Sequence, residues 1–274
     1  MARERKAKRR PKVRARENTI LALFAHADDM EFVAAGTLLH LADRGFKLHT
    51  AIMTRGNCGS THDPPGVIAR IRRREATDSA RLLGASFTCL EEDDLNIFYD
   101  KRTLGKVMEL IRRVNPRLVL THSPSDYMVD HETTSHLAQT ACFGALAPNY
   151  KTGVRPPARP TGFIPHLYYA APMGGRDILG SLIRSSLLVD TSDVFDRQMD
   201  MLTCHKSQRE WLLAHLGMDN YTEFLRRRSE EQGREAGVAF AEGFRQHLGG
   251  GFPSDDELTN ILGERVIKNP KTQT

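Results

Sequence analysis

The sequence predicts an α/β fold in which a mostly parallel, Rossmann-like sheet carries helices on both faces of a single domain. Strand-like apolar runs alternate with helical patterns along the chain, and strands separated by helices form βαβ units. With 274 residues, 40% hydrophobic and 27% charged, the chain is long enough for one large domain or at most two small ones.

The individual elements follow from the spacing of apolar residues. The expected strands are 19–25, 49–54, 87–90, 117–121, 166–171 and 186–190, and the expected helices are 31–44, 66–83, 103–114, 131–143, 193–204, 206–216 and 236–247. Helix ends are indicated by Gly45, Gly84 and the pair Asn115-Pro116. Residues 144–165 hold five prolines and three glycines and are expected to form a long surface excursion.

Both ends of the chain depart from this pattern. Residues 1–16 hold nine Lys and Arg and one Glu, whereas the whole chain has a net charge of +5, so the remainder is mildly acidic. Such a charge run predicts a disordered, solvated tail over residues 1–17, or alternatively an arm that contacts polyanions. No nucleic-acid partner is expected of the folded body, residues 18–248. Residues 249–274, which begin with three glycines, are expected to form a loosely held tail.

The composition also bears on the compartment. No apolar run approaches the roughly 18 residues needed to span a membrane, so no membrane span is expected. Thr19–Ala25 follows basic residues, as in a signal peptide, but seven apolar residues are at the short limit and a buried strand is expected instead. Cys58, Cys89, Cys142 and Cys204 include no C-x-x-C pair, which indicates neither a disulfide framework nor a cysteine zinc site and fits a cytoplasmic protein.

Two clusters of histidines and carboxylates follow predicted strands. Residues 26–31 (HADDME) follow the first strand, and residues 122–132 (HSPSDYMVDHE) follow the strand at 117–121. Because ligands bind at the carboxyl ends of strands in open parallel sheets, the two clusters are expected to converge. Imidazole and carboxylate groups suit zinc, and a catalytic zinc keeps three protein ligands and an open position for water. A lone H-x-D-D is commonly a polar turn, but two such clusters favour a metal site.

At these residues the chain resembles the LmbE-like (PIG-L) family of zinc-dependent N-acetylglucosaminyl deacetylases. AHADDMEF…GTL is similar to the family signature A-H-P-D-D-x-E…G-G-T-L, and DYMVDHETTS is similar to D-Y-H-P-D-H-x-x-(T/S)-S. Three further matches follow in the family's order along the chain. They are MTRGNCGS followed by RRREA and LLGA, the segment from Asp190 to HKSQ at 205–208, and AGVAFAEGF. The resemblance covers about residues 18–248.

The resemblance implies a site and a reaction. One divalent metal ion per chain, expected to be zinc, would be held by His26, Asp29 and His131. Asp28 would be the general base, Asp130 would orient an imidazole, and Arg72 would contact the substrate. The implied reaction removes an N-acetyl group from a small amino-sugar conjugate, as in the glycosylphosphatidylinositol, mycothiol and bacillithiol precursors. Family members often form trimers or hexamers, so a homo-oligomer is expected by resemblance alone.

Met128 departs from the family pattern, which usually has His there to support the tetrahedral intermediate or donate a proton. A thioether can do neither, which leaves three alternatives. Tyr127, His205 or protonated Asp28 takes over the function of this histidine, the substrate differs from that of the family, or the activity is weak. Asn57 replaces the family's Glu after Thr-Arg-Gly, in a loop expected to line the substrate pocket.

Met128 also supports an alternative function, a metal- and sugar-binding protein of the same fold with weak or no deacetylase activity. The retained Asp28 argues against this alternative, because a binding protein has no need of a base beside its metal ligand. A dinucleotide-binding enzyme is a weaker hypothesis, because H-A-D-D stands where such enzymes have G-x-G-x-x-G. Trp211 is expected to serve in core or interface packing.

Overall fold

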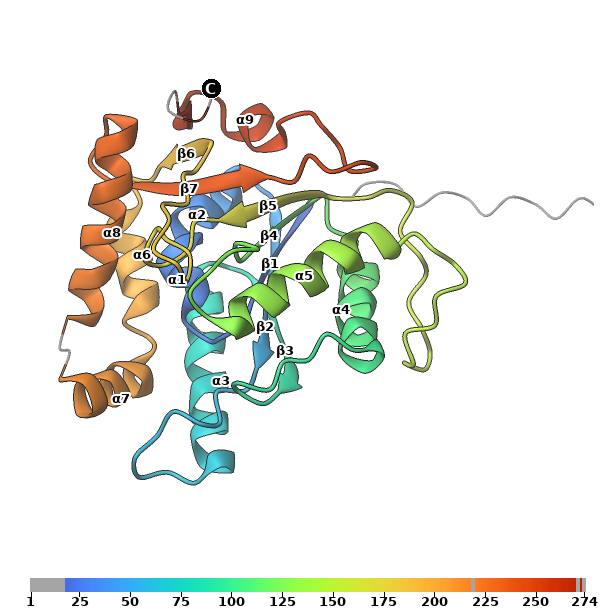
Figure 1. The fold of residues 1–274 in the computed structure, drawn as a ribbon, viewed down its shortest axis with the longest axis horizontal. Helices are drawn as coiled ribbons and strands as arrows, with labels where there is room; N and C mark the ends of the chain where they lie inside the picture. Colours follow the sequence, from blue (N-terminus) through green and yellow to red (C-terminus); the bar gives the residue numbers. More distant parts are fainter. Residues whose placement is uncertain (1–17, 218–219, 270–271, 273–274) are drawn as a thin grey trace, which may run out of the picture.

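The computed structural model describes residues 18–217, 220–269 and 272; the predicted basic tail, residues 1–17, lies outside them. Its centre is an eight-stranded sheet with the order β3-β2-β1-β4-β5-β7-β6-β8 (Figure 1). The strands are β1 (Thr19–Phe24), β2 (Lys47–Thr54), β3 (Ser86–Glu92), β4 (Leu118–Thr121), β5 (His166–Ala170), β6 (Leu187–Asp190), β7 (Ala241–Gln246) and β8 (Val266–Lys268). The first five pair in parallel and the other three antiparallel, which confirms the predicted α/β fold with a mostly parallel sheet.

Helices cover both faces of this sheet. They are α1 (Asp29–Val33), α2 (Ala35–Asp43), α3 (Pro65–Leu82), α4 (Lys101–Val114), α5 (Val129–Gly144), α6 (Phe195–Leu202), α7 (Lys206–Leu216), α8 (Tyr221–Ala236) and α9 (Glu257–Leu262). Figure 1 shows α4 and α5 on one side of the central strands and α1, α2 and α6 on the other. No helix among residues 18–217, 220–269 and 272 is long and apolar enough to cross a bilayer.

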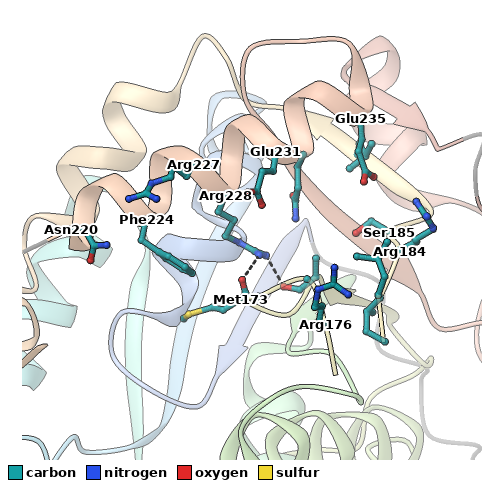
Figure 2. Close-up of a pocket in the computed structure, with 17 residues that line it drawn as sticks. Met173, Arg176, Arg184, Ser185, Asn220, Phe224, Arg227, Arg228, Glu231 and Glu235 are labelled. Atoms are coloured by element: carbon teal, nitrogen blue, oxygen red, sulfur yellow. Dashed lines mark hydrogen bonds between the residues drawn. The ribbon is translucent and has the colours of Figure 1, made fainter. Parts of the chain in front are cut away.

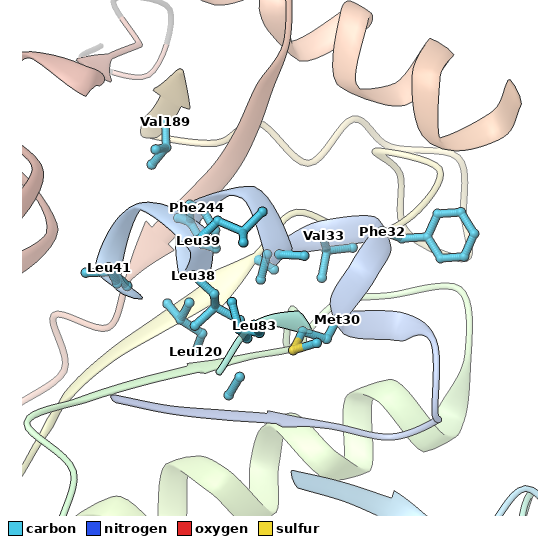
Figure 3. Close-up of a cluster of buried hydrophobic side chains, with 14 of the residues drawn as sticks. Met30, Phe32, Val33, Leu38, Leu39, Leu41, Leu83, Leu120, Val189 and Phe244 are labelled. Carbon is cyan, nitrogen blue, oxygen red and sulfur yellow. The ribbon is translucent and has the colours of Figure 1, made fainter. Parts of the chain in front are cut away.

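Alternating residues of β1 supply both cores, because successive side chains of a strand point to opposite faces. Ile20 and Phe24 pack in one buried cluster with residues of α1, α2, α6 and α8 (Figure 3), whereas Leu21 and Leu23 pack in a second cluster with residues of α4 and α5. All six residues of β1 are buried, so the turn that follows it starts from a fixed position.

The predicted functional clusters lie where the direction of strand addition reverses. β1 pairs with β2 on one side and with β4 on the other, so the connections leave β1 and β4 toward opposite halves of the sheet. Such a switch point opens a crevice at the carboxyl ends of the two strands. Residues 26–31 follow β1 and residues 122–132 follow β4, so both clusters reach this crevice.

The predicted helix over 31–44 is two helices in the structure. Ala34, with φ −151° and ψ −6°, separates α1 from α2. The buried carboxylate of Glu242 in β7 accepts hydrogen bonds from the N–H groups of Gly36 (2.8 Å) and Thr37 (2.7 Å) at the start of α2. A carboxylate stabilises a helix N-terminus in this way. The short α1 is thereby separate from α2, and it carries Asp29 and Glu31 of the first cluster, whereas His26 and Asp28 lie in the turn before it.

The C-terminal part differs most from expectation. The predicted helix over 236–247 is wrong, because α8 ends at Ala236, Gly237 adopts φ 74°, and the chain continues into β7. β7 lies between β5 and β6 and pairs with both, and this pairing outweighs the helix preference of residues such as Glu, Arg and Gln. Residues 249–274 were expected to be loosely held, but they contain α9 and β8, and β8 pairs with β6.

Candidate metal centre

The turn after β1 and the loop after β4 meet at the switch point. The Ala25 N–H, at the end of β1, lies 3.0 Å from Nε2 of His122, which directly follows β4. The His122 ring stacks on the His131 ring with centroids 3.9 Å apart and an angle of 7° between the planes. The two predicted clusters are therefore in contact, although 97 residues separate Ala25 from His122.

His26, Asp29 and His131 come together as a compact donor set. One ligand atom from each residue lies within 4.8 Å of the other two. Asp29 Oδ2 lies 3.2 Å from His26 Nδ1, and Asp29 Oδ1 lies 3.4 Å from His131 Nε2. Asp29 and His131 are buried, and the side chain of His26 is 15% exposed. Two imidazoles and one carboxylate form a donor set typical of a catalytic zinc site.

The ring of His131 is oriented for ligation. Its Nδ1 lies 3.0 Å from Asp126 Oδ1, while its Nε2 is buried and has no hydrogen-bond partner among the described residues. A metal-binding histidine commonly donates its second ring nitrogen to a carboxylate in this way, which fixes the tautomer and leaves the other lone pair for the metal. A buried nitrogen without a partner is costly unless a ligand satisfies it. His131 therefore fits a bound divalent cation.

Asp130 holds the ring of His26. Asp130 Oδ2 lies 3.2 Å from His26 Nε2 and accepts a hydrogen bond of 2.8 Å from the Leu95 N–H. Leu95 has φ 65°, in the left-handed region that few non-glycine residues adopt. A backbone N–H of the loop after β3 thus holds the Asp130 carboxylate in place while this carboxylate contacts the His26 ring.

The charges of the site favour a cation. Burial alone would raise the pKa of Asp29, but three neighbouring histidines outweigh this effect and hold the pKa well below its usual range. Asp29 and Asp126 likewise outweigh burial and raise the pKa of His131 to about 9. The pKa of His26 is raised well above its ordinary value by Asp29 and Asp130 against the effect of burial. Carboxylates thus make positive charge favourable at the place where the three donors meet.

A cavity of about 590 Å³ opens onto these donors. Its polar lining includes Asp28, Asp29, Arg72, Asp94, Gln208, Asn220 and Tyr221 together with His26 and His131. Its apolar lining includes Phe32, Leu95, Met128, Met173, Trp211, Leu212 and Phe224. Arg72 is buried, donates to the Gly59 carbonyl (2.8 Å), and has an Nε atom without a partner among the described residues. The cavity can therefore take a small molecule with both polar and apolar parts.

Three of the residues predicted from the sequence lie outside this cavity lining: Asp130, which holds the ring of His26, and Asn57 and His205. The Asn57 side chain accepts a hydrogen bond of 3.1 Å from the Asp94 N–H. His205 is buried with its Nε2 3.2 Å from Glu31 Oε1. Tyr127, by contrast, lines the cavity, with 53% of the residue exposed. Of the groups considered as substitutes for the family's histidine, Tyr127 and Asp28 face the cavity.

Three residues of the site were not predicted from the sequence to take part in catalysis or binding. Asp126 belongs to a recognised cluster, but only the folded chain shows that it holds His131. Trp211 was expected in packing, yet it is half-buried and lines the cavity from α7. Tyr221, at the start of α8, donates a hydrogen bond of 2.6 Å to Asp28 Oδ2. No local sequence pattern marks Tyr221, because the two residues are 193 positions apart.

A neighbouring cavity of about 480 Å³ shares Met173, Asn220 and Phe224 with the first and is drawn in Figure 2. Buried Arg228 in α8 donates there to the carbonyls of Pro172 (2.7 Å) and Met173 (3.1 Å). Arg228 thereby ties α8 to the loop after β5, which carries Met173 into the lining of the metal-centre cavity.

The chain is similar to several known proteins. Residues 21–142 match the family model PIG-L, described as GlcNAc-PI de-N-acetylase. The chain is 28% identical over 235 residues to a 4-oxalmesaconate hydratase of Pseudomonas putida, covering 82% of this chain and 85% of the relative. It is 27% identical over 212 residues to a probable N-acetyl-alpha-D-glucosaminyl L-malate deacetylase of Bacillus cereus, covering 72% and 86%. The crystal structure of the 4-carboxy-2-hydroxymuconate hydratase of Pseudomonas putida superposes with a TM-score of 0.69 at 26% identity, covering 87% of this chain and 98% of that one.

Proposed function

Because the chain carries a PIG-L family domain, we propose that it is a zinc-dependent hydrolase that releases acetate from an N-acetylated amino-sugar conjugate. One observation carries the proposal: the His26, Asp29 and His131 donors share a cavity with a further carboxylate, Asp28, which is available as a base. The expectations of a cytoplasmic location and of a homo-oligomer stay predictions.

The donor set fits zinc. Two imidazoles and a carboxylate match its preferred ligands, and among the described residues the buried Nε2 of His131 accepts no hydrogen bond and lies beside the carboxylate of Asp29. When bound, zinc lowers the pKa of water toward about 7 and polarises an amide carbonyl. Asp126 and Asp130 would keep the two ligand rings oriented for it.

The remaining residues of the cavity support amide hydrolysis. In this reaction the oxygen of a water molecule bonds to the acyl carbon, the C–N bond breaks, and the amine nitrogen takes up a proton. Asp28 accepts the proton of the attacking water and can pass it to the leaving nitrogen. Arg72 lines the cavity and would contact a polar group of the substrate, and Trp211 and Phe224 offer surface to an apolar group.

Hydration of a carbon–carbon double bond is the second candidate, because a relative that covers 82% of this chain is named a hydratase. That reaction also begins with an activated water, so a metal and a base serve both. A polycarboxylate such as 4-oxalmesaconate, however, needs several cationic partners. Arg72 is the one Lys or Arg among the described residues that line the cavity, while Asp28, Asp29 and Asp94 add negative charge. This balance favours an uncharged amide.

The test compares the two reactions directly. Zinc-loaded protein is assayed for acetate release from N-acetylglucosamine and for hydration of 4-oxalmesaconate. We expect acetate release, and we expect Asp28→Asn to retain zinc but lose turnover by roughly 10²–10⁴-fold, the usual worth of general acid–base catalysis. His26→Ala should instead lose the zinc. Hydration without acetate release would overturn the deacetylase assignment, and zinc binding without either reaction would support the binding-protein alternative.

A further inference from the structure

Asp28 lies at the start of α1 but does not act as its cap. A carboxylate in this position commonly accepts hydrogen bonds from the first N–H groups of the helix. Asp28 makes no such bond. Its Oδ2 instead accepts a hydrogen bond of 2.6 Å from the hydroxyl of Tyr221, the first residue of α8. We propose that Tyr221 is a positioning residue that holds the Asp28 carboxylate for proton transfer, an inference that rests on the proposed hydrolase function.

The hydrogen bond lies in a protected environment. Asp28 is 6% exposed and Tyr221 is 4% exposed, and among the described residues the Tyr221 hydroxyl is the hydrogen-bond partner of this carboxylate. Burial and the neighbouring Asp28 raise the pKa of Tyr221 well above its ordinary value, so its hydroxyl stays protonated and donates. At 2.6 Å, the distance lies within the usual range for a hydrogen bond from a hydroxyl to a carboxylate oxygen.

Tyr221 is itself held firmly. Its ring packs edge-on against Phe32 of α1, with centroids 5.2 Å apart. Two turns further along α8, buried Arg228 donates to the carbonyls of Phe32 (3.2 Å) and Ala171 (2.7 Å). The labelled Arg228 in Figure 2 extends from α8 toward this loop. α8 is therefore fixed against both α1 and the loop after β5, and it presents the Tyr221 hydroxyl at a defined place.

The consequence is a fixed orientation of the base. With Oδ2 bonded to Tyr221, rotation of the Asp28 carboxyl group is restrained, and its other oxygen is left for the water in the cavity. Reaction rates are sensitive to such placement, and an error of about 1 Å can lower a rate roughly 10²-fold. Tyr221 thus acts through Asp28 without contacting the reacting atoms.

The test is a double-mutant cycle in the zinc-loaded full chain. Tyr221→Phe, Asp28→Asn and the double variant are compared for kcat and KM of acetate release from N-acetylglucosamine. The control is Tyr168→Phe, which removes a buried hydroxyl that donates to Asp256 (3.1 Å) away from the cavity. We expect Tyr221→Phe to lower kcat by roughly 10–100-fold with little change in KM, as for a group that acts only in the transition state. Tyr168→Phe should stay within about twofold of wild type, the change expected for a remote site.

The decisive outcome is the coupling. If Tyr221 acts through Asp28, the double variant turns over as slowly as Asp28→Asn alone; full additivity of the two losses would overturn the inference. Wild-type turnover in Tyr221→Phe, beside a large loss in Asp28→Asn, would sink the inference and leave the proposed function intact. Normal turnover in Asp28→Asn would overturn the role of the base itself. Zinc content and thermal unfolding of each variant identify any loss caused by misfolding.

Discussion

Asp126→Asn should weaken zinc binding without disturbing the fold. Asp126 Oδ1 accepts from His131 Nδ1 (3.0 Å) and from the Tyr127 N–H (2.8 Å). Asparagine has nearly the same volume, and its carbonyl oxygen can accept both hydrogen bonds. The substitution therefore removes mainly the negative charge behind the His131 ring.

The size of the effect follows from burial. Asp126 and His131 are each 1% exposed, so the charge acts on the imidazole with little screening by solvent. Loss of a carboxylate that supports a metal-binding histidine typically costs 10–100-fold in metal affinity, or about 1.4–2.8 kcal/mol. Because both groups are fully buried, we expect a loss in the upper half of this range.

The assay is competition for zinc with a chromophoric chelator at constant pH. The matched control is Asp193→Asn, which removes a carboxylate 3.4 Å from the buried imidazole of His40, a residue outside the metal centre. We expect the control to bind zinc as the wild type does. An unchanged affinity in Asp126→Asn, or an equal loss in both variants, would refute the assignment of His131 as a ligand oriented by Asp126.

Two further predictions concern packing and the departure from the family pattern. Gly36→Ala should lower the free energy of unfolding by about 1–3 kcal/mol in chemical denaturation, because the new Cβ would lie 2.6 Å from the methyl group of Thr191. Gly66→Ala, also at the second position of a helix but 3.8 Å from its nearest neighbour, should not destabilise the protein, and a loss as large as that of Gly36→Ala would contradict the packing argument. Met128→His should not raise kcat, because Asp130, which would have to hold the new ring, is already bonded to an imidazole and a backbone N–H; a tenfold gain would show that the new ring finds another partner.

The sequence by itself determined the first half of the fold and the identity of the metal-ligand candidates. Apolar runs such as Thr19–Ala25, alternating with helical patterns, predict the buried strands of a parallel sheet, and the polar residues after β1 and β4 then share one edge of that sheet. The two clusters could therefore be placed together from the sequence, and the family resemblance selected His26, Asp29 and His131 from them; the structure brings one ligand atom of each of these residues within 4.8 Å of the others.

The tertiary structure alone decided what surrounds those residues. β7 is a strand because it hydrogen-bonds to β5 and β6, and local propensity contains no information about that pairing. The position of α8 depends on Arg228 reaching backbone carbonyls far away in the sequence, and Tyr221 meets Asp28 only as a result. His205 and Asn57 lie outside the cavity lining for the same reason: a side chain's direction is set by packing between elements. Residue types and short spacings are properties of the chain, whereas contacts across 193 positions exist only once burial and hydrogen bonding have brought the elements together.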